Sequence, residues 1–465
     1  MKNQNQIEKS ENLTDYMISF LSDMIKAGKS EGGTSGRERD RAKLLEQKLL
    51  EITKNVHIDK FGNVCGAIGE LESPNQIIWF IGHIDTVAKG AWEDAFVPKI
   101  EDGKLYGRGS SDQLAGVVSS VGALKILKDE EKHLKSKGLK VVVMGNPHEE
   151  DCEGESIKFL LKEVKDNASK IPFWLKGLPD TIVTTEPTST KNGLPRPYFG
   201  HRGRYLYQMG IKGETGHASI PVEVPAAEVL TKSVANIFKK VKGFDSPKFG
   251  KDTYAFTTGE ITSPSFNAHT EIAKWNIDFR IAPTSTPESI LKDMQKCILE
   301  TRKEIAEEKN VELEKVPQIG FEIVSPKYKT YTGFIFTGLQ ELPGPWLPLT
   351  SNLRKLALEV YKDLFEIDPP YDKPNTNLPD KDEYSPEEGD LTIRDFYNFS
   401  TDLTAIAQLR RKAKKGKKTQ NIEYMGLGSG VEEQAHRENE WCPISSLANA
   451  TAYYVALVLR LGEEK

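Results

Sequence analysis

The sequence contains little cysteine and carries little net charge. Among 465 residues only four are cysteine, and these lie far apart without any CxxC pair. The spacing therefore indicates neither a disulfide framework nor a thiolate zinc site. A formal net charge of -5 provides no general attraction to nucleic acid. The basic run at residues 410–418 has no aromatic platform beside it, which favours a solvated loop over nucleic-acid binding.

Long apolar runs are also missing. Hydrophobic residues make up 38% of the chain and charged residues 28%, and no apolar stretch is long enough to cross a bilayer. The first residues, MKNQNQIEKSENL, are polar and charged, unlike a secretory signal peptide. We therefore expect a cytoplasmic protein that has no membrane partner.

The order of apolar patterns predicts two domains, because one core rarely organises a chain of this length. Up to residue 199, strand-like runs such as QIIWFIG, LKVVVMGN and DTIVTT alternate with helical stretches. This alternation indicates an α/β fold with a doubly wound, mostly parallel sheet. Residues 318–465 contain similar runs and are predicted to complete the same domain. Within them, the acidic and proline-rich residues 367–390 predict an irregular surface insertion.

Residues 200–317 have a different pattern. Two segments, 202–214 and 271–283, alternate between apolar and polar residues like half-exposed antiparallel strands. Two others, 226–241 and 286–310, have the periodicity of amphipathic helices. The pattern predicts a smaller inserted α+β domain, with two helices on one antiparallel sheet.

Histidine and acidic residues gather where the predicted strands and a glycine-rich turn end. In open α/β sheets, ligands bind beyond the carboxyl ends of the strands, so we expect these side chains to meet there. They are His83, Asp112, Glu149, Glu150, Glu186 and His436.

Each of these residues has a simpler interpretation when taken alone. Asp112 could cap a helix, His83 could be a satisfied core histidine, and Glu186 could polarise a turn. Their combination favours a metal site, because carboxylates brought together without a cation repel one another. Imidazole and carboxylate ligands without thiolate suit zinc, with cobalt or manganese as alternatives.

The charges predict two ions rather than one. Asp112, Glu150 and Glu186 supply three negative charges, and a bridging hydroxide supplies the fourth needed to balance two divalent cations. Asp85 lies two residues after His83, so both side chains face the same side of an extended chain. We therefore expect the Asp85 carboxylate to orient the imidazole.

The sequence resembles the dinuclear zinc amidohydrolases that include acetylornithine deacetylase, succinyl-diaminopimelate desuccinylase, aminoacylase and carboxypeptidase G. The resemblance covers nearly the whole chain. The matching segments, in the family's order, are IDKFGNV, GHIDTV, WEDAFVPKIEDGKLYGRGSSD, HEEDCEG, TTEPT, KGETGHASIP, DFRIAP, STD and AHRENE. The pair HEEDCEG and HRGR is most similar to the deacetylase-like branch of the family.

The resemblance implies roles for the candidate ligands. Asp112 would bridge two metal ions, of which one is also held by His83 and Glu186. Glu150 and His436 would hold the other ion. The resemblance further implies that residues 1–199 and 318–465 form a catalytic domain that binds both metals, and that residues 200–317 form a lid or dimerisation domain.

The resemblance also implies catalytic and substrate-binding residues. Glu149 would be the general base for a water activated by both metals. His217 resembles a histidine that, in dimeric members, reaches the neighbouring subunit's site to stabilise an oxyanion, and a purely structural role is its alternative. Arg280 resembles an arginine that grips a substrate carboxylate, and Asn267 and Gly428 would contact substrate too.

Three departures from the family pattern concern substrate contacts. Gln113 replaces a lysine that is common after the bridging aspartate. FNAH stands where the family has an asparagine followed shortly by Ile-Pro, and the insertion at 367–390 is unusual. None of these differences alters the predicted metal ligands.

The implied function is hydrolysis of the amide bond of a small N-acyl amino acid by a homodimer. A dipeptidase or carboxypeptidase and an N-carbamoyl amide hydrolase are alternatives that would use the same site. Outside enzymes, the alternative is a metal-binding scaffold without turnover, which would have no need for Glu149 beside Glu150. A serine hydrolase fits poorly, because no GxSxG motif follows a strand.

Overall fold

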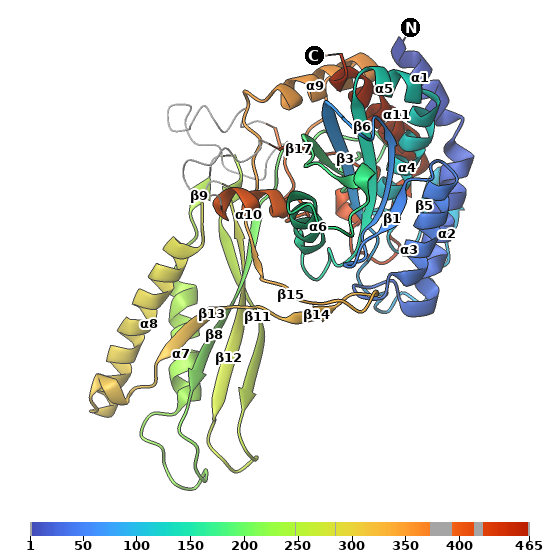
Figure 1. Ribbon diagram of the computed structural model, residues 1–465. Helices are drawn as coiled ribbons and strands as arrows, with labels where there is room; N and C mark the ends of the chain where they lie inside the picture. The colour runs from blue at the N-terminus through green and yellow to red at the C-terminus, as the bar shows by residue number, and fades with distance from the viewer. Residues whose placement is uncertain (1, 247, 284, 373–392, 413–421, 464–465) are drawn as a thin grey trace.

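The computed structural model of the chain describes residues 2–246, 248–283, 285–372, 393–412 and 422–463. A large domain built on a central sheet carries an elongated smaller domain (Figure 1). The basic run at 410–418 begins in helix α10 (Thr404–Lys412), and the rest of it lies outside the described residues. Most of the predicted insertion at 367–390 also lies outside them.

A six-stranded sheet forms the centre of the large domain. In spatial order its strands are β1 (Val56–Ile58), β2 (Val64–Gly69), β6 (Leu139–Asn146), β3 (Gln76–His83), β7 (Thr181–Thr184) and β17 (Glu423–Gly426). The last four run parallel, whereas β1 and β2 are antiparallel to their neighbours. Every residue of β6, β3 and β7 is buried, as expected for a sheet with helices on both faces. The predicted mostly parallel α/β fold is confirmed.

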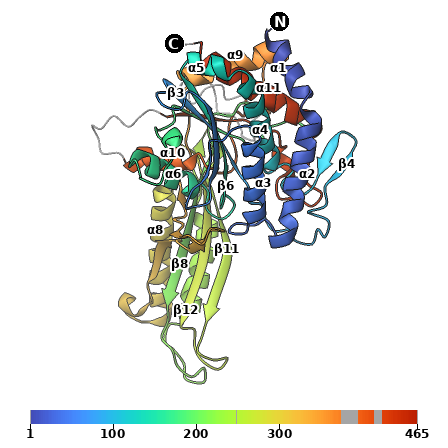
Figure 2. The same ribbon diagram turned by 45° about the vertical axis from the view of Figure 1, so that its right-hand side comes forward.

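Helices cover both sides of this sheet (Figure 2). One side carries α2 (Thr14–Glu31), α3 (Arg39–Leu50) and α4 (Leu114–Asp129), and the other carries α6 (Glu155–Lys165) and α10. Helix α4 contacts β3 and β6 and also packs against the C-terminal helix α11 (Ile444–Leu461). The remaining helices of the large domain are α1 (Lys2–Glu11), α5 (Glu131–Ser136) and α9 (Asn352–Phe365).

Helix α11 differs from the sequence expectation about apolar runs. Among the described helices it alone is long and apolar enough to span a membrane by length and composition. In the structure it packs against α4, α9 and α1, and most of its side chains belong to the core of the large domain. Burial within the protein accounts for its apolar composition.

The smaller domain is one antiparallel sheet with two helices against it. Its strands are β11 (Thr253–Thr262), β12 (Ile272–Ile281), β8 (Gly203–Lys212) and β13 (Ile319–Ile323), and β16 (Glu341–Leu342) also pairs with β8. Helices α7 (Ala226–Lys240) and α8 (Glu288–Lys309) pack against each other and form a separate core with the sheet. The predicted division after residue 317 falls before β13, yet β13 extends the smaller sheet.

The antiparallel pairing of β8 and β12 decides which residues face the large domain. Arg204, near the start of β8, pairs with Arg280, near the end of β12. At the opposite end of the same ladder Lys212 pairs with Ile272, and the loops that follow lie farthest from the large domain (Figure 1). Arg204 also forms an ion pair with Glu153 of the large domain at 3.2 Å. The two domains are therefore linked at the arginine end of the smaller sheet.

Candidate metal centre

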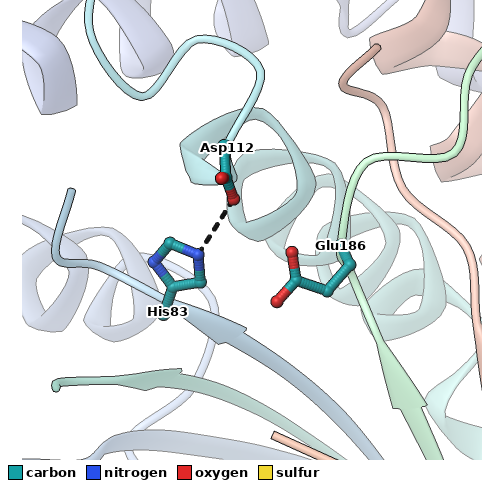
Figure 3. Close-up of side chains that lie close together, drawn as sticks. All are labelled: His83, Asp112 and Glu186. Atoms are coloured by element: carbon teal, nitrogen blue, oxygen red, sulfur yellow. Dashed lines mark hydrogen bonds and ion pairs between the residues drawn. The ribbon is translucent and has the colours of Figure 1, made fainter. Parts of the chain in front are cut away.

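His83, at the end of β3, is oriented for metal binding by a backbone group. Its Nδ1 donates a hydrogen bond to the carbonyl oxygen of Asp85 at 2.9 Å, and its ring is 1% exposed. Because the ring proton is then on Nδ1, the lone pair of Nε2 is available to a metal ion. This Nε2 atom lies 3.1 Å from Oδ1 of Asp112 (Figure 3).

The carboxylate of Asp85 has a second function that the sequence did not suggest. Its Oδ1 lies 3.5 Å from Nδ1 of His83. It also accepts the backbone N–H groups of Glu149 at 3.2 Å and Glu150 at 3.1 Å, and the hydroxyl of Ser35 at 2.7 Å. Asp85 therefore holds the loop that carries the two glutamates as well as facing the histidine.

Asp112 lies between the two histidines. Its Oδ1 faces His83, and its Oδ2 lies 3.2 Å from Nε2 of His436. It does not cap α4, since no side-chain cap bond is present at the start of that helix. One oxygen toward each histidine is the arrangement that a bridging carboxylate needs.

Buried Glu440 fixes the turn that carries Asp112. Its carboxylate accepts the backbone N–H groups of Ser111 at 2.8 Å, Asp112 at 2.9 Å and Gly109 at 3.1 Å. It also receives a hydrogen bond from Arg108 at 2.8 Å. Glu440 lies within the AHRENE segment, but only the contact across more than 300 residues reveals this function.

Glu150 and His436 form the other half of the cluster. Oε2 of Glu150 lies 3.0 Å from Nε2 of His436, and its Oε1 accepts the backbone N–H of Val87 at 3.0 Å. Hydrogen bonding to Asp112 and Glu150 raises the pKa of His436 to about 10. The His436 ring therefore lies against two carboxylates, whose negative charge would also attract a metal ion.

Glu186, which follows β7, completes the first half of the cluster (Figure 3). Its side chain is buried, and its Oε1 has no hydrogen-bond partner among the described residues. Donor atoms of His83, Asp112 and Glu186 lie within 4.8 Å of one another, and so do those of Asp112, Glu150 and His436. The structure thus brings all five predicted ligands together in two groups that share Asp112.

This donor set fits two divalent cations. Burial, together with the charge of Asp112, raises the pKa of Glu186 well above its ordinary range. An unpartnered buried carboxylate oxygen is costly unless a cation or proton completes its environment. Nitrogen and oxygen donors without sulfur match the preferences of borderline divalent metals.

Glu149 lies beside both groups and belongs to neither among the described residues. It is 7% exposed, and its Oε2 is 3.8 Å from Nε2 of His83. Burial, reinforced by the charge of Glu186, raises its pKa well above the ordinary value. A carboxyl group with a raised pKa next to a cation site can accept and return a proton.

A cavity of about 680 Å³ opens onto this cluster. From the small domain it is lined by Arg280, whose Nε donates to Asp278 at 2.7 Å, and by Arg204. Its other lining residues include Glu153, Asp372, Arg394, Asn398, Phe399, Ser400 and Glu432. Besides the metal cluster and Glu149, this lining contains Arg280 and Ser400 from the sequence motifs DFRIAP and STD.

A known protein family matches the part of the chain that contains most of the candidate metal ligands. The profile of peptidase family M20/M25/M40 matches residues 79–323, just over half of the chain. The chain belongs to this family. The resemblance inferred from the sequence motifs is thereby confirmed, and the protein is an enzyme of the metallohydrolase class.

Relatives of similar length are known for this M20/M25/M40 member. It is 26% identical to the uncharacterized protein YgeY of Escherichia coli over 97% of this chain and 96% of that protein. It is 25% identical to an uncharacterized metallohydrolase of Methanocaldococcus jannaschii over 69% of this chain and 81% of that protein. A succinyl-diaminopimelate desuccinylase of Wolbachia pipientis is 29% identical over 35% of this chain and 38% of its own length.

Solved structures share the complete fold. The dipeptidase Dug1p of Saccharomyces cerevisiae aligns with a TM-score of 0.66 at 14% identity and covers 99% of each chain. Human carnosine dipeptidase 1 aligns with a TM-score of 0.64 at 12% identity, over 100% of this chain and 99% of that one. At such low identity these similarities establish the fold alone.

Among the predicted catalytic and substrate-binding residues, His217, Asn267 and Gly428 neither line the cavity of this M20/M25/M40 enzyme nor contact its metal cluster through a side chain. Exposed His217 accepts hydrogen bonds at Nδ1 from the Ser219 hydroxyl at 2.7 Å, and Asn267 lies 3.4 Å from its Nε2. Both belong to loops at the far end of the small domain. Gly428 is buried, and a Cβ there would lie 2.3 Å from the carbonyl oxygen of Glu186. The absence of a side chain at Gly428 thus lets its backbone pack closely against that of the metal ligand Glu186.

Proposed function

We propose that this enzyme hydrolyses the amide bond of a small N-acyl amino acid, with Glu149 as the general base. The observation that carries the proposal is the position of Glu149, buried against the two candidate ligand groups but outside both. A protein that only stores or senses metal has no need for a second buried acid there.

We propose zinc as the native metal, with cobalt or manganese as alternatives, because the donors are imidazole and carboxylate. His83, Asp112 and Glu186 would hold one ion, and Asp112, Glu150 and His436 the other. When bound, such ions act as Lewis acids that lower the pKa of water and polarise a carbonyl group.

The side chains of the chain itself then have distinct tasks. Glu149 takes a proton from the attacking water and later delivers it to the departing amine. Arg280, at the other side of the cavity, would bind the substrate carboxylate. The Arg280 side chain is 36% exposed, and its guanidinium is held by Asp278, so it is pre-oriented while still accessible.

A cytoplasmic homodimer is part of the proposal. His217 and Asn267 lie on loops far from the metal cluster of their own chain, so they could act only on the site of another molecule. A hydrogen-bond donor such as His217 at a developing oxyanion typically contributes about 3 kcal/mol.

The direct test is a screen of N-acetyl, N-succinyl and N-carbamoyl amino acids and dipeptides with added zinc, cobalt or manganese and a chelated control. Glu149→Gln should lower kcat by about 10² to 10⁴-fold while metal content stays unchanged. Glu438→Gln, which removes an exposed acid close to His436, is the matched control and should retain activity. Wild-type turnover by Glu149→Gln would refute the assignment.

A dipeptidase is the second candidate. Two dipeptidases share the complete fold, and a cavity of about 680 Å³ is large enough for a dipeptide. A free C-terminal carboxylate would reach Arg280 in the same way as that of an N-acyl amino acid. Relative kcat/KM values in the same screen distinguish the two functions.

A further inference from the structure

Arg394 lines the cavity from the large domain, and buried Arg196 shares an ion-pair partner with it. Nη1 of Arg196 lies 2.5 Å from Oδ2 of Asp372, and Nη2 of Arg394 lies 3.2 Å from the same oxygen. Arg394 also donates from Nη1 to Glu432 at 2.8 Å. The arginine side chains are 3% and 10% exposed, whereas Asp372 is 49% exposed. The two buried guanidinium groups thus share one carboxylate oxygen of the half-exposed Asp372.

Tyr198 adds a buried polar group beside the two arginines. Its ring lies 5.6 Å from the guanidinium carbon of Arg196 and 5.8 Å from that of Arg394. Its hydroxyl is buried and has no hydrogen-bond partner among the described residues, and neither has Oε2 of Glu432. A buried O–H beside two guanidinium groups is a donor set suited to an anion.

We propose that Arg394, Arg196 and Tyr198 form a subsite for a second substrate carboxylate, whose place Asp372 takes in the free enzyme. The charges of Arg196, Arg394, Glu432 and Asp372 balance, and an incoming carboxylate that displaces Asp372 preserves that balance. A carboxylate entering from the cavity could also offer one oxygen to each guanidinium, which Asp372 does not.

The inference rests on the proposed amide hydrolysis and specifies its substrate class. Arg280 takes the carboxylate of the amino acid, and the Arg394 subsite takes another one in the same cavity. The second carboxylate can come from a dicarboxylic acyl chain or from an acidic amino-acid side chain. Both sources present the same chemistry to the arginines.

Three substrates separate these sources: N-succinyl-alanine, N-acetyl-aspartate and N-acetyl-alanine. The wild-type kcat/KM for one of the two dicarboxylates should exceed that for N-acetyl-alanine by about tenfold or more. The favoured compound identifies the source. Arg394→Gln should reduce this ratio about tenfold, mainly through KM, and Asp372→Asn should lower KM for the favoured dicarboxylate.

The matched control is Arg460→Gln, which removes an arginine paired with Asp363 at 3.1 Å outside the cavity and should leave the ratio unchanged. Equal loss of activity toward all three substrates in Arg394→Gln would show a structural role only and would overturn the proposal. A wild-type enzyme without preference for a dicarboxylate would also overturn it.

Binding measurements separate this proposal from the proposed function. Calorimetric titration of the metal-loaded protein compares succinate with butyrate, which has the same number of carbons and one carboxylate fewer. Tighter binding of succinate that disappears in Arg394→Gln supports the subsite even if no amide is hydrolysed. Equal binding of both acids, together with normal hydrolysis, contradicts the subsite alone.

Discussion

The two regions predicted to form the active site are assembled in different ways. In the large domain, ligands that are distant in sequence form two groups, and within each group the donor atoms lie within 4.8 Å of one another. Parallel strands bring their carboxyl ends to one edge, where the turn before α4 adds Asp112. In the small domain, antiparallel strands place successive loops at opposite ends of the sheet. Arg280 therefore faces the cavity, whereas His217 and Asn267 lie at the distant end.

One chain therefore supplies both groups of candidate metal ligands, whereas two of the predicted residues of the small domain lie away from that site. The metal cluster needs no second molecule, since all five residues of the two groups belong to one chain. On the far loops of the small domain, the exposed side chain of His217 has hydrogen-bond contacts with Ser219 and Asn267 of the same two loops. If that histidine is functional, it must act on another copy of the chain.

The largest expected effect comes from the residue common to both ligand groups. Asp112→Asn removes charge from both candidate metal positions, so bound metal should fall below one ion per chain and activity by about 10³-fold or more. Elemental analysis and kinetics measure the two effects. Two tightly bound ions in Asp112→Asn would contradict the shared position of this residue.

A smaller effect is expected in the small domain. His217→Ala should lower kcat by about 10² to 10³-fold without loss of metal. Mixing and refolding it with Glu149→Gln should restore up to about a quarter of wild-type activity, because mixed dimers contain one intact site. A mixture that stays inactive, or a strictly monomeric wild-type enzyme, would rule out action in trans.

The smallest effect concerns the junction between the two regions. His201 is fully buried, donates from Nδ1 to the carbonyl oxygen of Arg202 at 2.9 Å, and its burial lowers its pKa to about 4. The unfolded chain then binds a proton between about pH 6.5 and 4 that the folded chain does not, so stability should decrease as the pH falls through this range.

The contribution of His201 to this loss is roughly 3 kcal/mol at pH 4. Chemical denaturation from pH 7 to pH 4 measures the free energy of unfolding, and His201→Gln should show a weaker decrease than the wild type. Equal pH dependence in both proteins would show that His201 does not titrate as a buried neutral group.

The elements that hold the metal cluster could be predicted from the sequence. QIIWFIG and LKVVVMGN are continuous apolar runs, which only a buried strand or helix explains, and both are buried parallel strands. Because such strands end at one edge, the sequence also indicated which side chains meet there. The resemblance to the family motifs then assigned their roles.

Strands and contacts that depend on tertiary structure could not be predicted from the sequence. Strand β11 has a register shift between Phe256 and Gly259, which interrupts the period-two pattern by which strands are recognised. Strand β13 has only five residues, and pairing with β8 places it in the smaller sheet. The hydrogen bonds of Glu440 and the ion pairs of Arg394 join segments that are far apart in the chain. No local sequence pattern indicates such contacts.

The most direct test of the account is a crystal structure of the zinc-loaded protein with anomalous scattering measured at the zinc edge. We predict two peaks about 3.5 to 4 Å apart on either side of Asp112. One should contact His83 and Glu186, and the other Glu150 and His436. A single peak, or none at these side chains in metal-saturated crystals, would contradict the dinuclear centre.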